Sequence, residues 1–184
     1  MSSKSEKPKP KKAEEKVQAE NPMRKIFIEK VLLSAGATGD NLLKAKKLLE
    51  ILSSSKAQII ASTKRIPDFG ISPGLEVGTR VTLRGDKATE LLKRLLSAID
   101  NKIKKKQVVE NNFSFGVKEY IEIPGMEYQR DIGIRGFNVN VVFIRKGIRI
   151  SLKKIKSSKI PKKQRVSKKE IIKFMEDNFK TEFI

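Results

Sequence analysis

The chain has 184 residues and carries 41 lysine and arginine residues against 21 aspartate and glutamate residues, a net charge of +20 with a pI of about 10.1. A charge this large raises encounter rates with polyanions and indicates nucleic acid as the partner, with an anionic membrane surface as the competing one. The absence of cysteine and histidine excludes disulfides, thiolate metal sites and the Ser-His-Asp and Cys-His catalytic arrangements. Hydrophobic residues make up 38% of the chain, enough for the core of one domain.

Nothing in the sequence indicates a membrane-spanning or secreted protein. No apolar run approaches the roughly 18 residues of a spanning segment. The lysine-rich N-terminus lacks the apolar region of a signal peptide. We therefore expect a cytoplasmic protein with no membrane partner.

Residues 1–20 are rich in lysine, proline and glutamate and nearly free of large apolar residues, which predicts a disordered tail. Such a tail either binds nucleic acid or only keeps the chain soluble. We expect the folded domain to span residues 21–184.

The first elements expected are a strand at residues 26–33 and, after a turn at 36–40, a helix that Asp40 caps. The residues of this helix expected to face inward are Leu42, Leu43, Ala45, Leu49 and Leu52. A glycine turn between a strand and a helix can bind phosphate. The patterns G-x-G-x-x-G and G-x-x-x-x-G-K-[ST] are both missing, however, and a plain turn explains the residues.

A loop rich in glycine and proline at residues 63–78 follows a short strand expected at 58–61. It carries Lys64 and Arg65, and its apolar residues are too scattered to form a helical stripe. The loop is therefore either mobile or pinned by a few hydrophobic anchors. Ordered loops of this length are usually functional.

The strand after this loop alternates cleanly in residue type. Thr79, Val81 and Leu83 share one face, and Arg80, Thr82 and Arg84 share the other. The arginines suit a solvated sheet surface or RNA phosphates, and the charge of the whole chain favours RNA. Asp86 is expected to cap the next helix. The inward stripe of that helix is expected to hold Ala88, Leu91, Leu92, Leu95, Ile99 and Ile103.

Residues 111–145 are expected to hold two further strands. Residues 111–116 are interpreted as an aromatic and glycine loop that leads into a strand at 117–123. Residues 137–145 form the clearest strand, with Phe137, Val139, Val141 and Phe143 on one face and Asn138 and Asn140 on the other. Asparagine on an exposed sheet face can bond to sugar or base edges, although it usually meets only water.

Residues 145–165, called the basic extension below, contain ten lysine and arginine residues and no acid. Self-repulsion predicts that this segment orders only along a polyanion, so we expect it to follow a phosphate backbone. Ser167 and Glu170 then form a capping box that opens a final helix. Its apolar residues Ile171, Ile172, Met175 and Phe179 indicate that it folds back onto the core. Its acids Glu170, Glu176 and Asp177 argue against peripheral membrane binding.

No catalytic residue, metal site, cofactor or small-molecule substrate is expected. A histidine-free, metal-dependent nuclease would need two or three clustered carboxylates. Glu119 and Glu122 lie three residues apart on an expected strand, which puts them on opposite faces. Asp68 and Glu76 have no base or metal cluster beside them in the sequence.

Seven segments match, in order, those of the large-subunit ribosomal proteins of family five. They read N-P-M-R-K-I-x-I-E-K-V (21–31), G-D-x-L-x-K-A (39–45), K-R-I-P-D-F-G-I (64–71), V-T-L-R-G (81–85), N-F-S-F-G-V-K-E-Y-I-E-I-P-G (112–125), D-I-G-I-R-G-F-N-V (131–139) and S-K-I-P-K-K-Q-R-V-S-K-K-E (158–170). The chain thus resembles this family over nearly everything except the tail. The basic extension with its final helix, and Pro67, resemble the archaeal type.

The resemblance implies a single α+β domain, in which an antiparallel sheet packs helices on one face and presents the other to 5S rRNA in the central protuberance. It implies a non-enzymatic protein whose partners are 5S rRNA, large-subunit rRNA, P-site tRNA and neighbouring ribosomal proteins. The alternative is a free-standing basic RNA chaperone or regulatory RNA-binding protein, which would bind many RNAs with similar affinity.

The resemblance also assigns residues to each partner. Those expected on 5S rRNA are Lys30, Ser34, Ser55, Arg80, Thr82 and Arg84. Those expected in the loop that contacts P-site tRNA are Lys64, Arg65, Ile66, Pro67, Asp68, Phe69, Gly70, Ile71 and Gly74. Those expected to hold the basic extension on rRNA are Lys153, Lys154, Lys156, Lys159, Lys162, Lys163 and Arg165. The family usually has asparagine near position 34 and often glutamine near 55, and the serines found here reach fewer base or sugar atoms.

Overall fold

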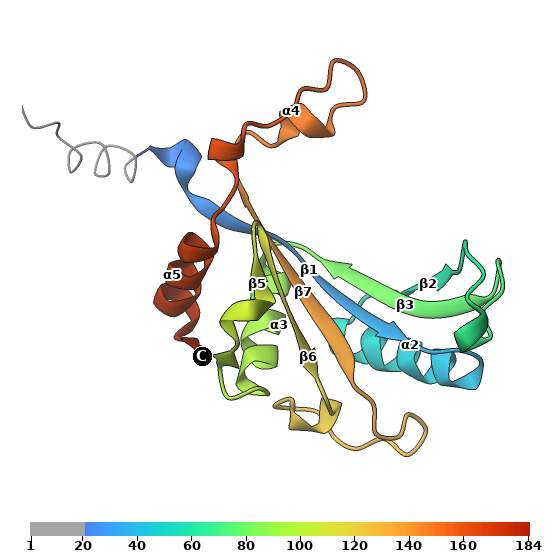
Figure 1. Ribbon diagram of the computed structural model, residues 1–184. Helices are drawn as coiled ribbons and strands as arrows, with labels where there is room; N and C mark the ends of the chain where they lie inside the picture. Colours follow the sequence, from blue (N-terminus) through green and yellow to red (C-terminus); the bar gives the residue numbers. More distant parts are fainter. Residues whose placement is uncertain (1–20) are drawn as a thin grey trace, which may run out of the picture.

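Six strands form an antiparallel sheet in the order β2–β3–β1–β7–β6–β5. They are β1 (Ile26–Gly36), β2 (Gln58–Ala61), β3 (Glu76–Leu83), β5 (Val108–Val109), β6 (Asn112–Val117) and β7 (Phe137–Arg145). The helices are α2 (Asp40–Ser53), α3 (Asp86–Ser97), α4 (Arg149–Leu152) and α5 (Lys168–Phe179), and β4 (Lys102–Ile103) pairs in parallel with β8 (Glu182–Phe183). A computed structural model describes residues 21–184 (Figure 1), so the predicted tail at 1–20 lies outside the described residues.

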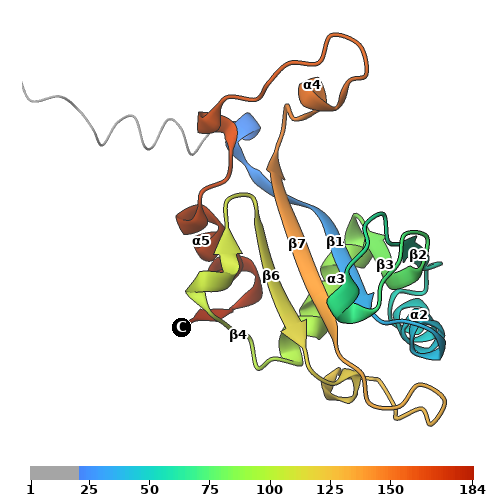
Figure 2. The same cartoon turned by 45° about the vertical axis from the view of Figure 1, so that its right-hand side comes forward.

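The helices of residues 21–184 cover only one face of this sheet. Val31 and Leu33 of β1 and Val81 and Leu83 of β3 point to that face and are 5% exposed or less. Helices α2 and α3 pack against them from the same side (Figures 1 and 2). At the other end of the sheet, α5 packs beside β5 and buries Met175 in the same core. The α+β fold expected from the sequence is confirmed, with one open face left on the sheet.

The two helix starts differ from the sequence prediction. Asp40 and Asp86 are the first residues of α2 and α3 rather than their caps, and neither helix has a side-chain cap bond. The cap positions belong to Gly39 and Gly85, whose φ angles of 59° and 68° suit glycine. The aspartates still lie in the first turn, where a negative charge is favourable near the helix N-terminus.

The predicted helix stripes need three corrections. Leu43 is 54% exposed, and the inward position is taken by Leu48, which is fully buried. Helix α3 ends at Ser97, so Ile99 follows the helix and Ile103 belongs to β4. The apolar stripe of α2 was predicted one position too wide, and that of α3 was continued past the end of the helix.

The strand predicted at 117–123 is wrong. The strand is β6, residues 112–117, and residues 120–122 form a short 3₁₀ turn. Phe113, Phe115 and Val117 alternate into the core, and pairing with β7 outweighs the turn preference of asparagine and glycine. The strands at 58–61 and 137–145 are confirmed, and the first strand runs to Gly36, beyond the predicted end.

None of the helices at residues 21–184 is both long enough and apolar enough to cross a membrane.

Candidate nucleic-acid interface

A row of polar side chains crosses four strands on the open face of the sheet and ends at a glycine on the fifth. The register pairs Gln58 with Arg80, Arg80 with Ser34, Ser34 with Asn138, and Asn138 with Gly116. Paired residues point to the same face of a sheet. On every strand of the row except the short edge strand β2, their positions alternate with buried ones, so this row lies on the face that the helices leave open.

Two further rows run beside the first. In one, Thr82 pairs with Leu32, Leu32 with Asn140, and Asn140 with Ser114. In the other, Lys30 pairs with Val142 and Val142 with Asn112. The open face is therefore a polar surface broken by a few partly exposed aliphatic side chains. Such a surface matches the wide, shallow minor groove and the loops of folded RNA.

The charges on this face lie on one side of it. Lys30, Arg80 and Arg84 come from β1 and β3, or directly follow β3, while the open-face positions of β6 and β7 carry no charge. The Arg80 Nε donates to Gln58 Oε1 at 3.1 Å, and Arg84 pairs with Glu29 at 3.3 Å. These contacts orient both guanidinium groups while leaving other donors exposed.

The uncharged side of the face contains a shallow depression of about 350 Å³. It is lined by Ser34, Gln107, Ser114, Phe115, Gly116, Asn138 and Asn140. A β carbon at position 116 would lie 3.3 Å from Asn138 Oδ1, so glycine leaves room for that amide. The depression thus offers amide and hydroxyl groups, which can hydrogen-bond to base edges and 2′-hydroxyls, in place of cations.

Five of the six residues expected on 5S rRNA come together on this face, and the sixth does not. Ser55 lies in the turn between α2 and β2, and its hydroxyl donates to the Ser53 carbonyl at 3.2 Å. The residues that the prediction missed are Gln58, Gln107, Asn112 and Ser114. The alternation of Asn112 and Ser114 with Phe113 and Phe115 was the signal that could have revealed two of them.

The loop between β2 and β3 is a closed hairpin tip. Gly74 N donates to Ser62 O and Ser62 N to Leu75 O, both at 2.8 Å, and Ile66 and Ile71 exchange two hydrogen bonds at 2.9 and 3.0 Å. These backbone bonds pin the loop, whereas its apolar side chains do not serve as the expected anchors. Phe69 at the tip is 77% exposed. The loop therefore presents Lys64, Arg65 and an aromatic ring to solvent together.

The lysines of the basic extension are all exposed, but its first residue is not. Arg145 is 5% exposed and pairs with Glu170 of α5 at 2.5 Å, so it belongs to the core. Arg165 is 51% exposed by its side chain and pairs loosely with Glu110 at 3.4 Å. The expectation that the segment orders only along a polyanion is wrong at Arg145, and Val166, which directly follows the segment, is also fully buried.

Glu170 combines three contacts at the start of α5. Burial raises the pKa of its carboxyl, but hydrogen bonds from Ser167 and the neighbouring Arg145 guanidinium outweigh this and lower the pKa below its ordinary value of 4.5. The predicted capping box is therefore confirmed, and it also anchors the basic extension.

Known proteins with similar sequences identify the family of this chain. The C-terminal model of the ribosomal L5 family matches residues 76–174. The large ribosomal subunit protein uL5 of Nanoarchaeum equitans is 42% identical over 168 residues, which is 90% of this chain and 99% of the relative. The chain belongs to the ribosomal L5 family.

Two further archaeal relatives carry the same name. The uL5 protein of Picrophilus torridus is 41% identical, covering 90% of this chain and 96% of the relative. That of Methanobrevibacter smithii is 40% identical, covering 89% of this chain and 98% of the relative. The archaeal type expected from the basic extension is thus confirmed.

Membership in the ribosomal L5 family makes the chain a non-enzymatic protein, in agreement with the sequence prediction. Residues 21–184 contain no group of three or more acidic side chains that could hold a metal ion. The members of the family are ribosomal proteins, so the open face and the loops are considered below as RNA-binding surfaces.

Proposed function

We propose that this chain, a structural constituent of the large ribosomal subunit in the cytoplasm, binds 5S rRNA in the central protuberance through the open face of its sheet. The observation that carries the proposal is the row of polar side chains that crosses four strands, from Gln58 to Asn138, and ends at Gly116, on the face that the helices leave open. Folded RNA is recognised by phosphate, 2′-hydroxyl and loop-base contacts, and this surface offers groups for each.

The two sides of the face have different tasks in this proposal. Lys30, Arg80 and Arg84 bind phosphates and supply affinity through counterion release. Asn138 and Asn140 bond to base or sugar edges and set the register of the RNA on the sheet. Ser34 lies where the two sides meet and Thr82 lies between Arg80 and Arg84, and both hydroxyls can accept from or donate to a 2′-hydroxyl.

The hairpin tip and the basic extension contact the remaining partners. The loop from Lys64 to Gly74 contacts the P-site tRNA, with Lys64 and Arg65 on phosphates and the exposed Phe69 ring against the sugar or base surface. The seven cations from Lys153 to Arg165 hold the extension on large-subunit rRNA. Exposed loop residues beyond these remain available to neighbouring ribosomal proteins.

The natural absence of cysteine makes a direct test possible. Single-cysteine variants Thr82→Cys and Phe69→Cys can each carry a tethered iron chelate that cleaves nearby RNA by hydroxyl radicals. Lys47→Cys, on the exposed side of α2, is the matched control. In assembled ribosomes with P-site tRNA, we expect cleavage of 5S rRNA from position 82 and of tRNA from position 69.

Position 47 should cleave 5S rRNA less than position 82 does, because it lies on the opposite side of the sheet. Equal cleavage of 5S rRNA from positions 82 and 47 would contradict the assignment of the open face. Absence of tRNA cleavage from position 69 would contradict the role of the hairpin tip alone.

A further inference from the structure

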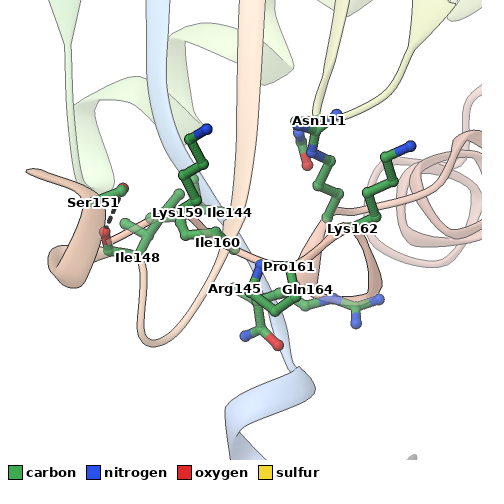
Figure 3. Close-up of a pocket in the computed structure, with 11 residues that line it drawn as sticks. Asn111, Ile144, Arg145, Ile148, Ser151, Lys159, Ile160, Pro161, Lys162 and Gln164 are labelled. Carbon is green, nitrogen blue, oxygen red and sulfur yellow. Dashed lines mark hydrogen bonds between the residues drawn. The ribbon is translucent and has the colours of Figure 1, made fainter. Parts of the chain in front are cut away.

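The two ends of the basic extension enclose a pocket of about 540 Å³. Figure 3 shows it between the end of β7 and the returning segment that carries Lys159 and Lys162. Its apolar walls come from Ile144, Ile148, Ile160 and Pro161. Ile144 also lies on the open face of the sheet, as does Asn140, which precedes it by four residues on β7. The pocket therefore continues the surface on which RNA is proposed to lie.

Hydrogen bonds hold the base of this pocket in place. Asn111 Oδ1 accepts from Val166 N at 2.7 Å, and the Asn111 carbonyl accepts from Phe143 N at 2.7 Å. Gln164 Nε2 donates to the Lys146 carbonyl at 2.9 Å, which joins the outgoing and returning parts of the extension. The pocket is thus preformed, and a ligand would not have to order this part of the chain.

The side-chain amides of Asn111 and Gln164 line the pocket, and each has one polar group that forms no hydrogen bond to another described residue. Asn111 Nδ2, a donor, and Gln164 Oε1, an acceptor, form no hydrogen bond within residues 21–184. Each group can bond to a polar atom of a ligand that reaches it, the Asn111 amide as a donor and the Gln164 amide as an acceptor. Nucleobases carry such atoms on their Watson–Crick edges.

The charge around the pocket favours an anionic ligand. Lys159, Lys162 and Arg165 line it, and none of the described residues that line it is acidic. Arg165 shares its charge with Glu110, which leaves the two exposed lysines as the strongest cations. A flat apolar body with a polar edge and adjoining phosphates has the matching chemistry.

We propose that this pocket takes one unpaired nucleotide of rRNA, with its base against the isoleucine and proline side chains and its phosphates on Lys159 and Lys162. The unused amide group of Asn111 or of Gln164 bonds to a polar atom of this nucleotide. This proposal rests on the proposed function, because it needs rRNA beside the sheet. It assigns base recognition to a segment whose charge alone would give only non-specific affinity.

The test compares two variants of the full-length protein bound to 5S and large-subunit rRNA. Ile148→Trp fills the pocket, and Ile155→Trp makes the same change at a 77% exposed position of the same segment that does not line it. Chemical probing of Watson–Crick edges should reveal an unpaired base that the native chain protects. Ile148→Trp should lose this protection and bind about tenfold more weakly, because the apolar contact between one base face and the pocket walls is lost. Ile155→Trp should keep the base protection and the native affinity.

A second variant does not depend on how the added ring packs. Lys159→Gln combined with Lys162→Gln removes two exposed charges without touching the core, and it should weaken protection of the same base. Circular dichroism should show that both the pocket variants and the control are folded.

The outcomes separate this inference from the proposed function. If the native chain protects rRNA but both pocket variants leave every base protection unchanged, the pocket proposal is overturned and the proposed function stands. If the pocket variants instead lose only a crosslink to a neighbouring ribosomal protein, the occupant is a protein side chain and the proposal is also overturned. If the native chain protects no rRNA at all, the pocket proposal and the proposed function are both contradicted.

Discussion

The open face of the sheet and the basic extension carry the same kinds of cation on very different supports. Arg80 lies on β3 between Thr79 and Val81, which are 1% and 3% exposed, so its backbone position is determined by the core. The lysines of the extension lie on a segment in which only Arg145 is buried, and the next buried residue is Val166, directly after the segment. The open face therefore carries few charges on a backbone that the core fixes. The extension carries many charges on a backbone that the core fixes only near its ends.

This difference indicates how the two regions divide the work of binding RNA. Counterion release depends on how many phosphates are neutralised and only weakly on where the cations stand. Hydrogen bonds to base and sugar edges need donors and acceptors in defined places. We therefore expect affinity to come mainly from the extension and discrimination between RNAs mainly from the sheet.

Removing charge from the extension should have the largest effect on affinity. Changing Lys153, Lys154, Lys156, Lys159, Lys162 and Lys163 to glutamine removes six potential phosphate contacts. At about 0.7 per contact, the slope of log K against log salt should fall by about 4. The native chain should bind RNA more tightly than the variant at about 50 mM salt. This advantage in affinity should shrink by more than a hundredfold by about 200 mM salt, as measured by filter binding. An unchanged slope would show that the extension does not follow a phosphate backbone.

Glu170→Gln should test the one arginine of the extension that belongs to the core. This change leaves Arg145 buried without a counter-charge, and unfolding by urea should show a loss of about 3 kcal/mol, the low end for such a group. Glu110→Gln is the matched control, because its partner Arg165 is exposed, and it should cost less than about 1 kcal/mol. Equal losses in the free energy of unfolding would contradict the placement of Arg145 in the core.

Asn140→Ala should test whether the sheet face discriminates between RNAs. Losing a hydrogen bond to a base or sugar edge should weaken 5S rRNA binding by about 1–3 kcal/mol, and by the same factor at every salt concentration. Affinity for an unrelated structured RNA should not change. A loss that vanishes at high salt would instead indicate an electrostatic role for this part of the face.

Arg84→Ala should have a smaller effect that depends on salt. Arg84 is 62% exposed by its side chain and shares its charge with Glu29, so it should contribute about one phosphate contact. Binding to 5S rRNA should weaken, and the salt slope should fall by about 1. Unchanged affinity at moderate salt would count against phosphate binding by the sheet face.

Acid should weaken the anchor of the extension in a defined pH range. Because the pKa of Glu170 is lowered on folding, its contribution to stability is present above about pH 4.5 and is lost as the pH falls through the lowered value. Between about pH 5 and pH 3, the native chain should lose more stability than Glu170→Gln, as followed by urea unfolding. Parallel losses in the two proteins would exclude this carboxyl as the cause.

Strands with a clear alternation could be predicted from the sequence alone, and those with mixed signals could not. Phe137 to Arg145 alternates without interruption, so β7 was found with its correct ends. Asn112 and Gly116 have strong turn preferences, so β6 was taken for a loop although Phe113 and Phe115 alternate into the core. Pairing with β7 decides that segment, and such pairing is not a local property.

The candidate site was predictable in its charges but not in its arrangement. Arg80 and Thr82 could be placed on one face from their spacing. Their alignment with Ser34 and Asn138 depends on strand pairings between residues that are some fifty to a hundred positions apart in the sequence. The pairing of Arg145 with Glu170 was hidden for the same reason, and the arginine was counted with the RNA-binding cations.

The central claim is that the sheet face recognises 5S rRNA specifically. The most direct test is to measure binding to 5S rRNA and to an unrelated structured RNA of the same length across a salt series. We predict a preference of about a hundredfold or more, equivalent to about 2.7 kcal/mol, that persists as the salt concentration rises. Equal affinities that fall together with salt would contradict the claim, and the chain would then act as a general RNA chaperone.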